Sequence, residues 1–293
     1  MLLILSLVLS QAAGAQTLTV DAAKQQIEKI IAASGAEVAV AYLPLPWPEG
    51  EAAGGILIDA GKTFHAASTM KVPVMIEAFR QAEAGGIALD APIPVTNTFK
   101  SIVDGSPYEL SATEDSDGDV YKAIGRTMTL RELVTASITV SSNLATNILI
   151  ETLGPENVRK TVAALGGEGM VVLRGVEDQK AFDKGLNNTT TARALMVLLE
   201  KIARGEAVSR AASRGMADIL RMQQFNDAIP AGLPEGVAVG HKTGSITRIN
   251  HDAAIVYAER PYVLVILTRG IEDGAKSAAL MAGISRVIYS TQR

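Results

Sequence analysis

Apolar residues recur at helical spacing over several long stretches of the chain. The first stretch lies between Asp21, which can cap a helix at its start, and Gly35, which can end it. A second covers residues 68–84, where Pro73 is tolerated because it falls near the helix start. Further helices are expected at residues 130–138, 143–153, 155–165, 190–204, 209–224 and 275–289.

Short β-branched and apolar runs near both ends of the chain predict strands. They cover residues 38–43, 55–59, 237–241, 253–257 and 262–268. Strands at both ends with helices between them predict an α+β fold of two lobes: an antiparallel sheet built from both termini and flanked by helices, plus an all-helical lobe. We expect one domain over residues 16–293. Its sheet lobe would cover about 21–65 and 225–293 and its helical lobe about 66–224, with a cleft between them.

Two stretches interrupt this pattern. Residues 97–125 are acidic and rich in Ser, Asp and Gly, and we expect a long surface insertion there. Residues 166–188 are expected to form a loop. The run from Asp115 to Asp119 is not a calcium loop, because its glycine stands at the fourth position and Arg126 takes the place of the twelfth-position glutamate.

The first residues have the pattern of a secretory signal peptide. Residues 2–9 are apolar except for Ser6, and Ala13-Gly14-Ala15 is a small-x-small cleavage pattern. The apolar run is much shorter than the roughly 20 residues that span a bilayer. We therefore expect residues 1–15 to be removed near Ala15 and the mature protein to be secreted or periplasmic, without stable membrane insertion.

The amino-acid composition excludes several kinds of functional site and partner. The chain of 293 residues has no cysteine, which excludes disulfides, thiolate zinc sites, iron–sulfur clusters and a cysteine nucleophile. Its three histidines are far apart, so no histidine-built metal site is expected. A net charge of −4 without a basic block argues against nucleic acid or an anionic membrane as partner. A small molecule or peptide remains as the expected partner of a protein that we expect to be a monomer.

Ser68 and Lys71 form an S-x-x-K motif at the start of a predicted helix. At this spacing the two side chains share one helix face, close enough for an amine to take the hydroxyl proton. The alternative is a purely structural role, with a serine that caps the helix beside a solvated lysine. The flanking residues are apolar, however, and a lysine on a buried helix is costly unless it has a function.

Two further short motifs follow along the chain. Ser141-Ser142-Asn143 falls between two predicted helices, where one of its serines could simply cap a helix. Lys242-Thr243-Gly244 ends a predicted strand and is followed by Ser245, and it could be a plain β-turn. Neither motif is informative alone.

In this order, S-x-x-K, S-x-N and K-T-G resemble the penicillin-recognising serine hydrolases, and specifically class A β-lactamases. The resemblance covers roughly residues 21–293. It extends to Gly86-Ile87-Ala88-Leu89-Asp90, Leu130-Arg131-Glu132-Leu133 and Thr189-Thr190-Thr191-Ala192.

The resemblance implies a role for each matching residue. Ser68 would become acylated, Lys71 would deprotonate it directly or through a water, and Ser141 would pass a proton to the leaving nitrogen. Asn143 would bind the substrate amide. The substrate carboxylate would be bound by Lys242, Thr243 and Ser245, and Arg248 is a weaker candidate for the same task. The amides of Ser68 and Ser245 would hold the oxyanion, and no metal or organic cofactor would be required.

The loop at residues 166–188 departs from the family pattern. Glu177 stands where the family's E-x-x-L-N has the glutamate that activates the deacylating water, but Ala181 replaces the asparagine. Glu177 could instead form a salt bridge with Arg174, and Asn187 or Asn188 could compensate for the missing amide. Ser142 also replaces the aspartate of S-D-N, a buried carboxylate that normally braces that turn.

The expected function is therefore an exported serine hydrolase that opens β-lactam rings through an acyl-enzyme on Ser68. The alternative is a D,D-peptidase or penicillin-binding acyl-transferase that acts on peptidoglycan stem peptides and deacylates slowly. A third reading is a sensor that is acylated once and stays blocked.

Overall fold

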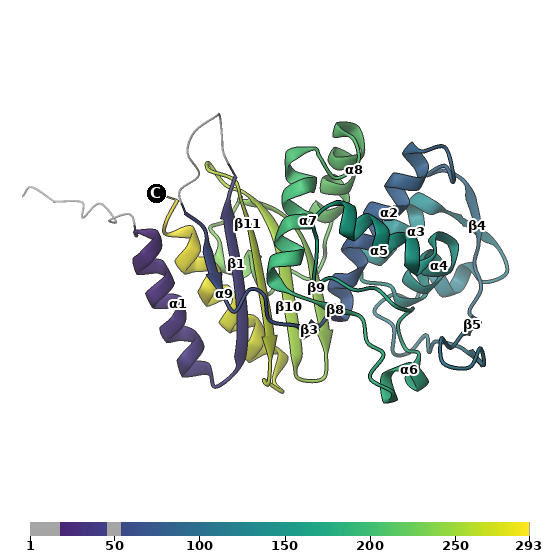
Figure 1. Cartoon of the computed structure of the whole chain (residues 1–293), viewed down its shortest axis with the longest axis horizontal. Coiled ribbons are helices and arrows are strands. Elements are labelled where there is room, and N and C mark those ends of the chain that lie inside the picture. Colours follow the sequence, from purple (N-terminus) through teal and green to yellow (C-terminus); the bar gives the residue numbers. More distant parts are fainter. Residues whose placement is uncertain (1–17, 46–53, 293) are drawn as a thin grey trace, which may run out of the picture.

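The computed structural model describes residues 18–45 and 54–292, so the predicted signal peptide lies outside the described residues (Figure 1). The helices are α1 (Val20–Ser34), α2 (Lys71–Glu83), α3 (Leu130–Thr139), α4 (Asn143–Leu153), α5 (Pro155–Ala164), α6 (Gln179–Asp183), α7 (Ala192–Arg204), α8 (Arg210–Arg221) and α9 (Gly274–Tyr289), with 3-10 turns η1 (Ala67–Met70), η2 (Val120–Ala123) and η3 (Pro230–Gly232). The strands are β1 (Glu37–Pro44), β2 (Ile56–Ile58), β3 (Phe64–His65), β4 (Pro92–Pro94), β5 (Phe99–Lys100), β6 (Pro107–Tyr108), β7 (Thr127–Thr129), β8 (Thr189–Thr190), β9 (Ala238–Ile246), β10 (Ile249–Tyr257) and β11 (Tyr262–Arg269).

One five-stranded sheet joins both ends of the chain. Its order is β2-β1-β11-β10-β9, and every neighbouring pair is antiparallel. The last strand in sequence, β11, is thus the central one: Val265 pairs with Ala41 of β1 on one side and with Ala253 of β10 on the other. The predicted α+β fold with a sheet built from both termini is confirmed.

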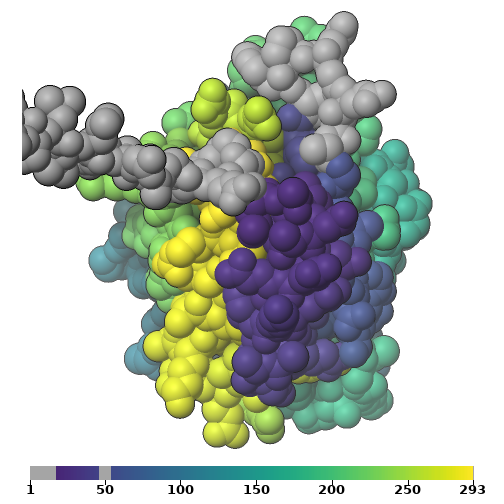
Figure 2. Space-filling view, turned by 90° about the vertical axis from the view of Figure 1, so that its left-hand side faces the viewer, coloured from purple at the N-terminus to yellow at the C-terminus, as the bar shows by residue number. Residues whose placement is uncertain are grey.

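Side chains alternate between the two faces of each strand, and each face of the sheet packs against its own core. In β1, Val40 and Tyr42 belong to the core beneath α1 and α9, whereas Ala39 and Ala41 belong to the larger core that contains α7. Figure 2 shows the N-terminal helix α1 lying beside the C-terminal helix α9 on the outer face. The Leu18 amide also donates to the Ser290 carbonyl at 3.2 Å.

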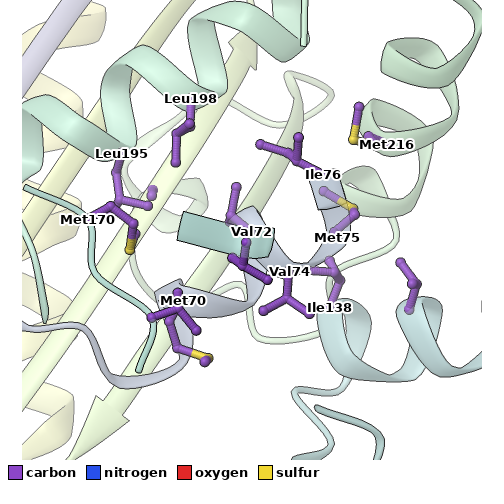
Figure 3. Close-up of a cluster of buried hydrophobic side chains, with 14 of the residues drawn as sticks. Met70, Val72, Val74, Met75, Ile76, Ile138, Met170, Leu195, Leu198 and Met216 are labelled. Atoms are coloured by element: carbon purple, nitrogen blue, oxygen red, sulfur yellow. The ribbon is translucent and has the colours of Figure 1, made fainter. Parts of the chain in front are cut away.

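Helix α2 runs through the middle of the helical part. Every residue from Lys71 to Phe79 is buried, as expected for a helix that is apolar on nearly all sides. Figure 3 shows its Val72 and Ile76 among buried side chains of the surrounding elements, including Leu198 of α7 and Met216 of α8. The 3-10 turn η1, which leads into α2, lies at the edge of the sheet next to β9.

Three sequence expectations need correction. The side chain that caps α1 is Thr19, and Asp21 lies in the first helical turn. The K-T-G motif lies inside β9, which continues to Ile246 because it pairs with β10 along its whole length. Residues 97–125 are more than a surface insertion, since they contain β5, β6 and η2 and bury side chains such as Phe99.

None of the helices in the described ranges is long and apolar enough to cross a membrane.

Candidate active site

Ser68 lies in the 3-10 turn η1, directly before α2. The preceding residue, Ala67, has φ of 45°, and its amide donates to Nδ1 of His65 at 3.0 Å. This sharp turn directs the chain from the β3 strand into the helix. Ser68 is half-buried and lines two adjoining hollows of about 420 and 560 Å³ between the sheet edge and the helical part.

Lys71 is completely buried one turn later. Its Nζ donates three hydrogen bonds: to the Ser141 carbonyl at 2.7 Å, to the Ser141 hydroxyl at 3.1 Å and to Oδ1 of Asn143 at 2.9 Å. Burial lowers the pKa of Lys71 to about 7, although the nearby charges of Asp115 and Glu177 act to raise it. An amine with this pKa is partly neutral near pH 7 and can act as a base.

The Ser141–Asn143 turn joins α3 to α4. Ser141 has φ of 58°, a left-handed backbone that is strained for a serine, and Ser142 caps α4 through the Ala145 amide. The Ser141 hydroxyl accepts hydrogen bonds at 3.1 Å from both Lys71 and Lys242. Two donated hydrogen bonds occupy its oxygen, so its own proton remains available for a third group.

Strand β9 forms the opposite wall of the site and is an edge strand of the sheet. Lys242 is fully buried, and burial together with the charge of Lys71 holds its pKa well below its ordinary value. Gly244 lies against the start of the nucleophile segment: a Cβ there would be 3.1 Å from the amide nitrogens of Ser68 and Thr69. Thr243 and Ser245 flank this close approach and line the smaller hollow.

Glu177 reaches the site from the loop before α6. Its Oε1 accepts a hydrogen bond of 2.8 Å from Nδ2 of Asn143. The Asn143 amide therefore links Glu177 to Lys71. Partial burial raises the pKa of the Glu177 carboxyl, the hydrogen bond from Asn143 opposes this, and the charge of Asp115 adds to the rise. A carboxylate with a raised pKa is a better base than an ordinary one.

The other residues weighed for this loop have different partners. Arg174 is buried, and its guanidinium donates to the carbonyls of Leu186 and Gly175 and to Oδ1 of Asn187. Within the described residues no ion pair links Arg174 to Glu177, so the salt bridge considered from the sequence does not form. Asn188 bonds the backbone of Leu173 and Arg174, and its amide is therefore committed to the loop itself.

Arg248, the weaker candidate for carboxylate binding, stands in the turn between β9 and β10. It has φ of 60°, is exposed, and donates to the Gly270 carbonyl at 3.3 Å. It is not among the residues that line either hollow. Across residues 18–45 and 54–292, no group of three or more acidic or histidine side chains is arranged to hold a metal ion.

Two side chains that contact this site were missed from the sequence. Asp115 accepts hydrogen bonds from the amides of Asn143 and Leu144, and Asn147 bonds the backbone of Val176. Asn147 carries a weak signal, since it stands four residues after Asn143 and so lies on the same face of α4. For Asp115 the sequence gives no signal beyond the acidic composition of its loop.

The structure thus brings all eight candidate residues to one cleft or its wall: Ser68, Lys71, Ser141, Asn143, Glu177, Lys242, Thr243 and Ser245. Their individual roles remain predictions.

The chain is similar to known proteins over most of its length. The model of the Beta-lactamase enzyme family matches residues 22–292. A β-lactamase of Bacillus licheniformis is 30% identical over 181 residues, which make up only 57% of either chain. β-Lactamase CTX-M-97 of Escherichia coli is 27% identical over 275 residues, 92% of this chain and 88% of the relative. Among solved structures, an acyl-enzyme complex of a PBP-A variant with penicillin G has a TM-score of 0.77 at 24% identity and covers 94% of this chain and 98% of its own.

The fold is therefore that of the class A β-lactamases and PBP-A. The chain belongs to the β-lactamase enzyme family.

Proposed function

We propose that this protein hydrolyses β-lactams through an acyl-enzyme on Ser68. The observation that carries the proposal is the hydrogen-bonded chain from Lys242 through the Ser141 hydroxyl, Lys71 and Asn143 to Glu177, beside Ser68 in one cleft. It supplies Lys71 as the base for acylation and Glu177 as the base for deacylation. Membership of the β-lactamase enzyme family gives the substrate class.

In acylation, the Ser68 oxygen attacks the lactam carbonyl carbon while neutral Lys71 takes the hydroxyl proton, directly or through a water. The amides of Ser68 and Ser245 hold the oxyanion, a contribution of about 3 kcal/mol per donor. The carbon–nitrogen bond then breaks, and the Ser141 hydroxyl gives its proton to the leaving nitrogen. Lys71 already donates to the Ser141 oxygen and replaces that proton, so it ends the step neutral.

Substrate binding uses the two walls of the cleft. On β9, the hydroxyls of Thr243 and Ser245 bind the substrate carboxylate with help from the charge of Lys242. On the opposite wall, the Asn143 side chain binds the substrate amide. The Ser245 hydroxyl donates to Oδ1 of Asn250 at 2.9 Å in the free protein, so binding the carboxylate exchanges one acceptor for another.

In deacylation, Glu177 takes a proton from a water that attacks the ester carbon. It then returns this proton, directly or through Lys71, to the Ser68 oxygen, which leaves as the hydroxyl. Asn143 already donates to Glu177 and holds its carboxylate toward the cleft. The raised pKa of this carboxyl increases its strength as a base.

The second candidate is a D,D-peptidase or penicillin-binding acyl-transferase acting on peptidoglycan stem peptides. The specific observation that favours it concerns Ala181, which stands in place of the family's asparagine and is fully buried in α6. Asn187 and Asn188, which could compensate, bond Arg174 and its neighbours. A deacylating water then has fewer fixed partners beside Glu177, and the acyl-enzyme would be long-lived.

The deciding experiment is intact-mass spectrometry of the protein with penicillin G, with the free antibiotic followed in parallel. A short-lived or undetected adduct with steady loss of antibiotic supports the β-lactamase. An adduct that persists while the antibiotic survives favours the peptidase. Neither adduct nor hydrolysis would contradict both. Glu177→Gln sharpens the test, because only a β-lactamase converts from fast turnover to a trapped adduct.

We further propose that residues 1–15 are a signal peptide and that the mature enzyme is a monomer in the periplasm or cell exterior. Expression with the native leader, followed by mass measurement of the exported protein, tests cleavage near Ala15. Light scattering of the same sample tests the oligomeric state. A cytoplasmic product of full mass would contradict the export proposal.

A further inference from the structure

The segment at residues 97–125 contacts the Ser141–Asn143 turn through two consecutive residues. The Asp115 carboxylate accepts hydrogen bonds from the Asn143 amide, at 3.0 Å to each oxygen, and from the Leu144 amide at 3.0 Å. The Ser116 hydroxyl donates to the Val140 carbonyl at 2.6 Å. These contacts hold the backbone on both sides of Ser141.

The Asp115 contacts satisfy amides that have no partner within their own helix. Asn143 and Leu144 are the first two residues of α4, where the helix leaves its amides free. Ser142 caps only the Ala145 amide. A carboxylate is the strongest acceptor for such amides and is also favoured by the positive end of the helix dipole.

The turn held in this way carries the reacting groups. Ser141, with its left-handed backbone, presents its hydroxyl to both lysines, and this strained conformation persists only where the surroundings fix it. The Asn143 side chain, one peptide further along, bonds both Lys71 and Glu177. A shift of this turn would therefore move the proton donor and the Lys71–Glu177 link together.

We propose that Asp115 is a positioning residue for acylation, which supplies from a distant segment the carboxylate that braces the Ser141–Asn143 turn. The proposal rests on the proposed β-lactam chemistry of this site. Ser142 caps the Ala145 amide without a charge, and Asp115 supplies a carboxylate to the two amides before it.

The charge of Asp115 has a second effect on the same groups. It raises the pKa of Lys71 and also that of Glu177. Loss of this charge would lower both pKa values, whereas loss of a purely structural cap would change neither. The pH profile of acylation is therefore the readout that separates positioning and tuning from a structural role.

The test compares Asp115→Ala and Asp115→Asn with Asp117→Asn. Asp117→Asn is a matched control, because this substitution removes the same charge from the same loop. Asp117 accepts a hydrogen bond from the Asp119 amide at 2.8 Å and none from the Ser141–Asn143 turn. The second-order rate of acylation by penicillin G is measured between about pH 5 and about pH 9, together with the melting temperature of each variant. We expect Asp115→Ala to acylate at least about tenfold more slowly. Asp115→Asn keeps an oxygen acceptor and should lose less, with an acid limb at lower pH than in Asp117→Asn.

Two results would overturn the proposal. One is an Asp115→Ala variant whose acylation rate and acid limb match those of Asp117→Asn; the other is a lower melting temperature as its only change. If the wild-type protein forms no acyl-enzyme at all, the proposed function fails separately. Asp115 is then tested by amide hydrogen exchange at Asn143 and Leu144. Protection lost in Asp115→Ala but kept in Asp117→Asn supports the bracing, and unchanged protection contradicts it.

Discussion

Asn147 and Val176 are joined by two hydrogen bonds that close a small ring between α4 and the loop before α6. Oδ1 of Asn147 accepts from the Val176 amide at 2.6 Å, and its Nδ2 donates to the Val176 carbonyl at 3.0 Å. Val176 immediately precedes Glu177, so this pair fixes the backbone from which the candidate general base extends. The backbone amide and carbonyl of Val176 are thus both satisfied by one side-chain amide, as a neighbouring strand would satisfy them in a sheet.

The first prediction concerns Gly175, which packs against this pair. A Cβ at position 175 would lie 2.5 Å from Oδ1 of Asn147 and 3.0 Å from the Tyr108 hydroxyl. We expect Gly175→Ala to displace Asn147, release Val176 and slow deacylation by roughly tenfold or more, while acylation continues. The lifetime of the penicillin adduct measures this. Gly61→Ala is the control, because a Cβ there meets open space, and equal lifetimes in the two variants would refute the prediction.

The second prediction is the pH dependence of acylation. Only neutral Lys71 can accept the Ser68 proton, and its pKa is about 7. The pre-steady-state acylation rate should therefore rise with pH through about 7 and then level off. Because the charge of Glu177 raises the pKa of Lys71, Glu177→Gln should move the midpoint to lower pH. A flat profile across this range would exclude Lys71 as the base.

The third prediction concerns the contact between β9 and the nucleophile segment. In Gly244→Ala, the added methyl group would press against the amides of Ser68 and Thr69 at 3.1 Å. We expect β9 to move away from Ser68 and acylation to fall by about tenfold or more, since one oxyanion donor comes from each segment. Gly283→Ala, where a Cβ meets nothing within 4 Å and which lines neither hollow, should acylate at the wild-type rate. Similar rates in both variants would show that this contact is not critical.

The fourth prediction concerns acid stability. His251 is buried in β10, and its Nε2 lies 2.9 Å from the His65 carbonyl. Burial lowers its pKa to about 4, from the ordinary value of 6.5. The unfolded chain therefore binds a proton between these two pH values that the folded chain does not. The contribution of His251 to stability is complete above about pH 6.5 and is lost toward about pH 4, by roughly 3 kcal/mol at most.

Urea unfolding at several pH values measures this loss, and an NMR titration identifies its source. The His251 ring signals should titrate near pH 4. A midpoint at the ordinary histidine value would contradict the prediction, whatever the total change in stability. A His251→Gln variant should show a smaller decrease in unfolding free energy over the same range.

The sequence predicted most of the fold because the signals for it are local. Helix α4 was predicted with the residues it has, since its apolar spacing and its capping serine lie within one short stretch. Ser68 and Lys71 were found for the same reason, because their spacing alone places them on one helix face. The predicted family membership was confirmed.

What the sequence did not predict depends on contacts between distant residues. Asp115 stands 28 residues before Asn143, and no periodicity indicates that its acidic loop folds back onto that turn. The Asn147–Val176 pair spans 29 residues in the same way. The length of β9 was underestimated because Lys242 and Thr243 are polar. Pairing with β10, and not hydrophobicity, keeps them in the strand. The catalytic roles of the site residues stay predictions until they are measured.

The central place of β11 in the sheet has a consequence for the order in which the protein is made. Strand β10 reaches β1 only through β11, and helix α9, the last element of the chain, covers the outer face. A ribosome that has synthesised Ser68, Ser141 and Lys242 has therefore not yet made the strand that joins the two halves of the sheet. Such long-range pairing is slow to form. The sheet edge that forms one wall of the cleft is therefore joined to β1 only after β11 has been synthesised.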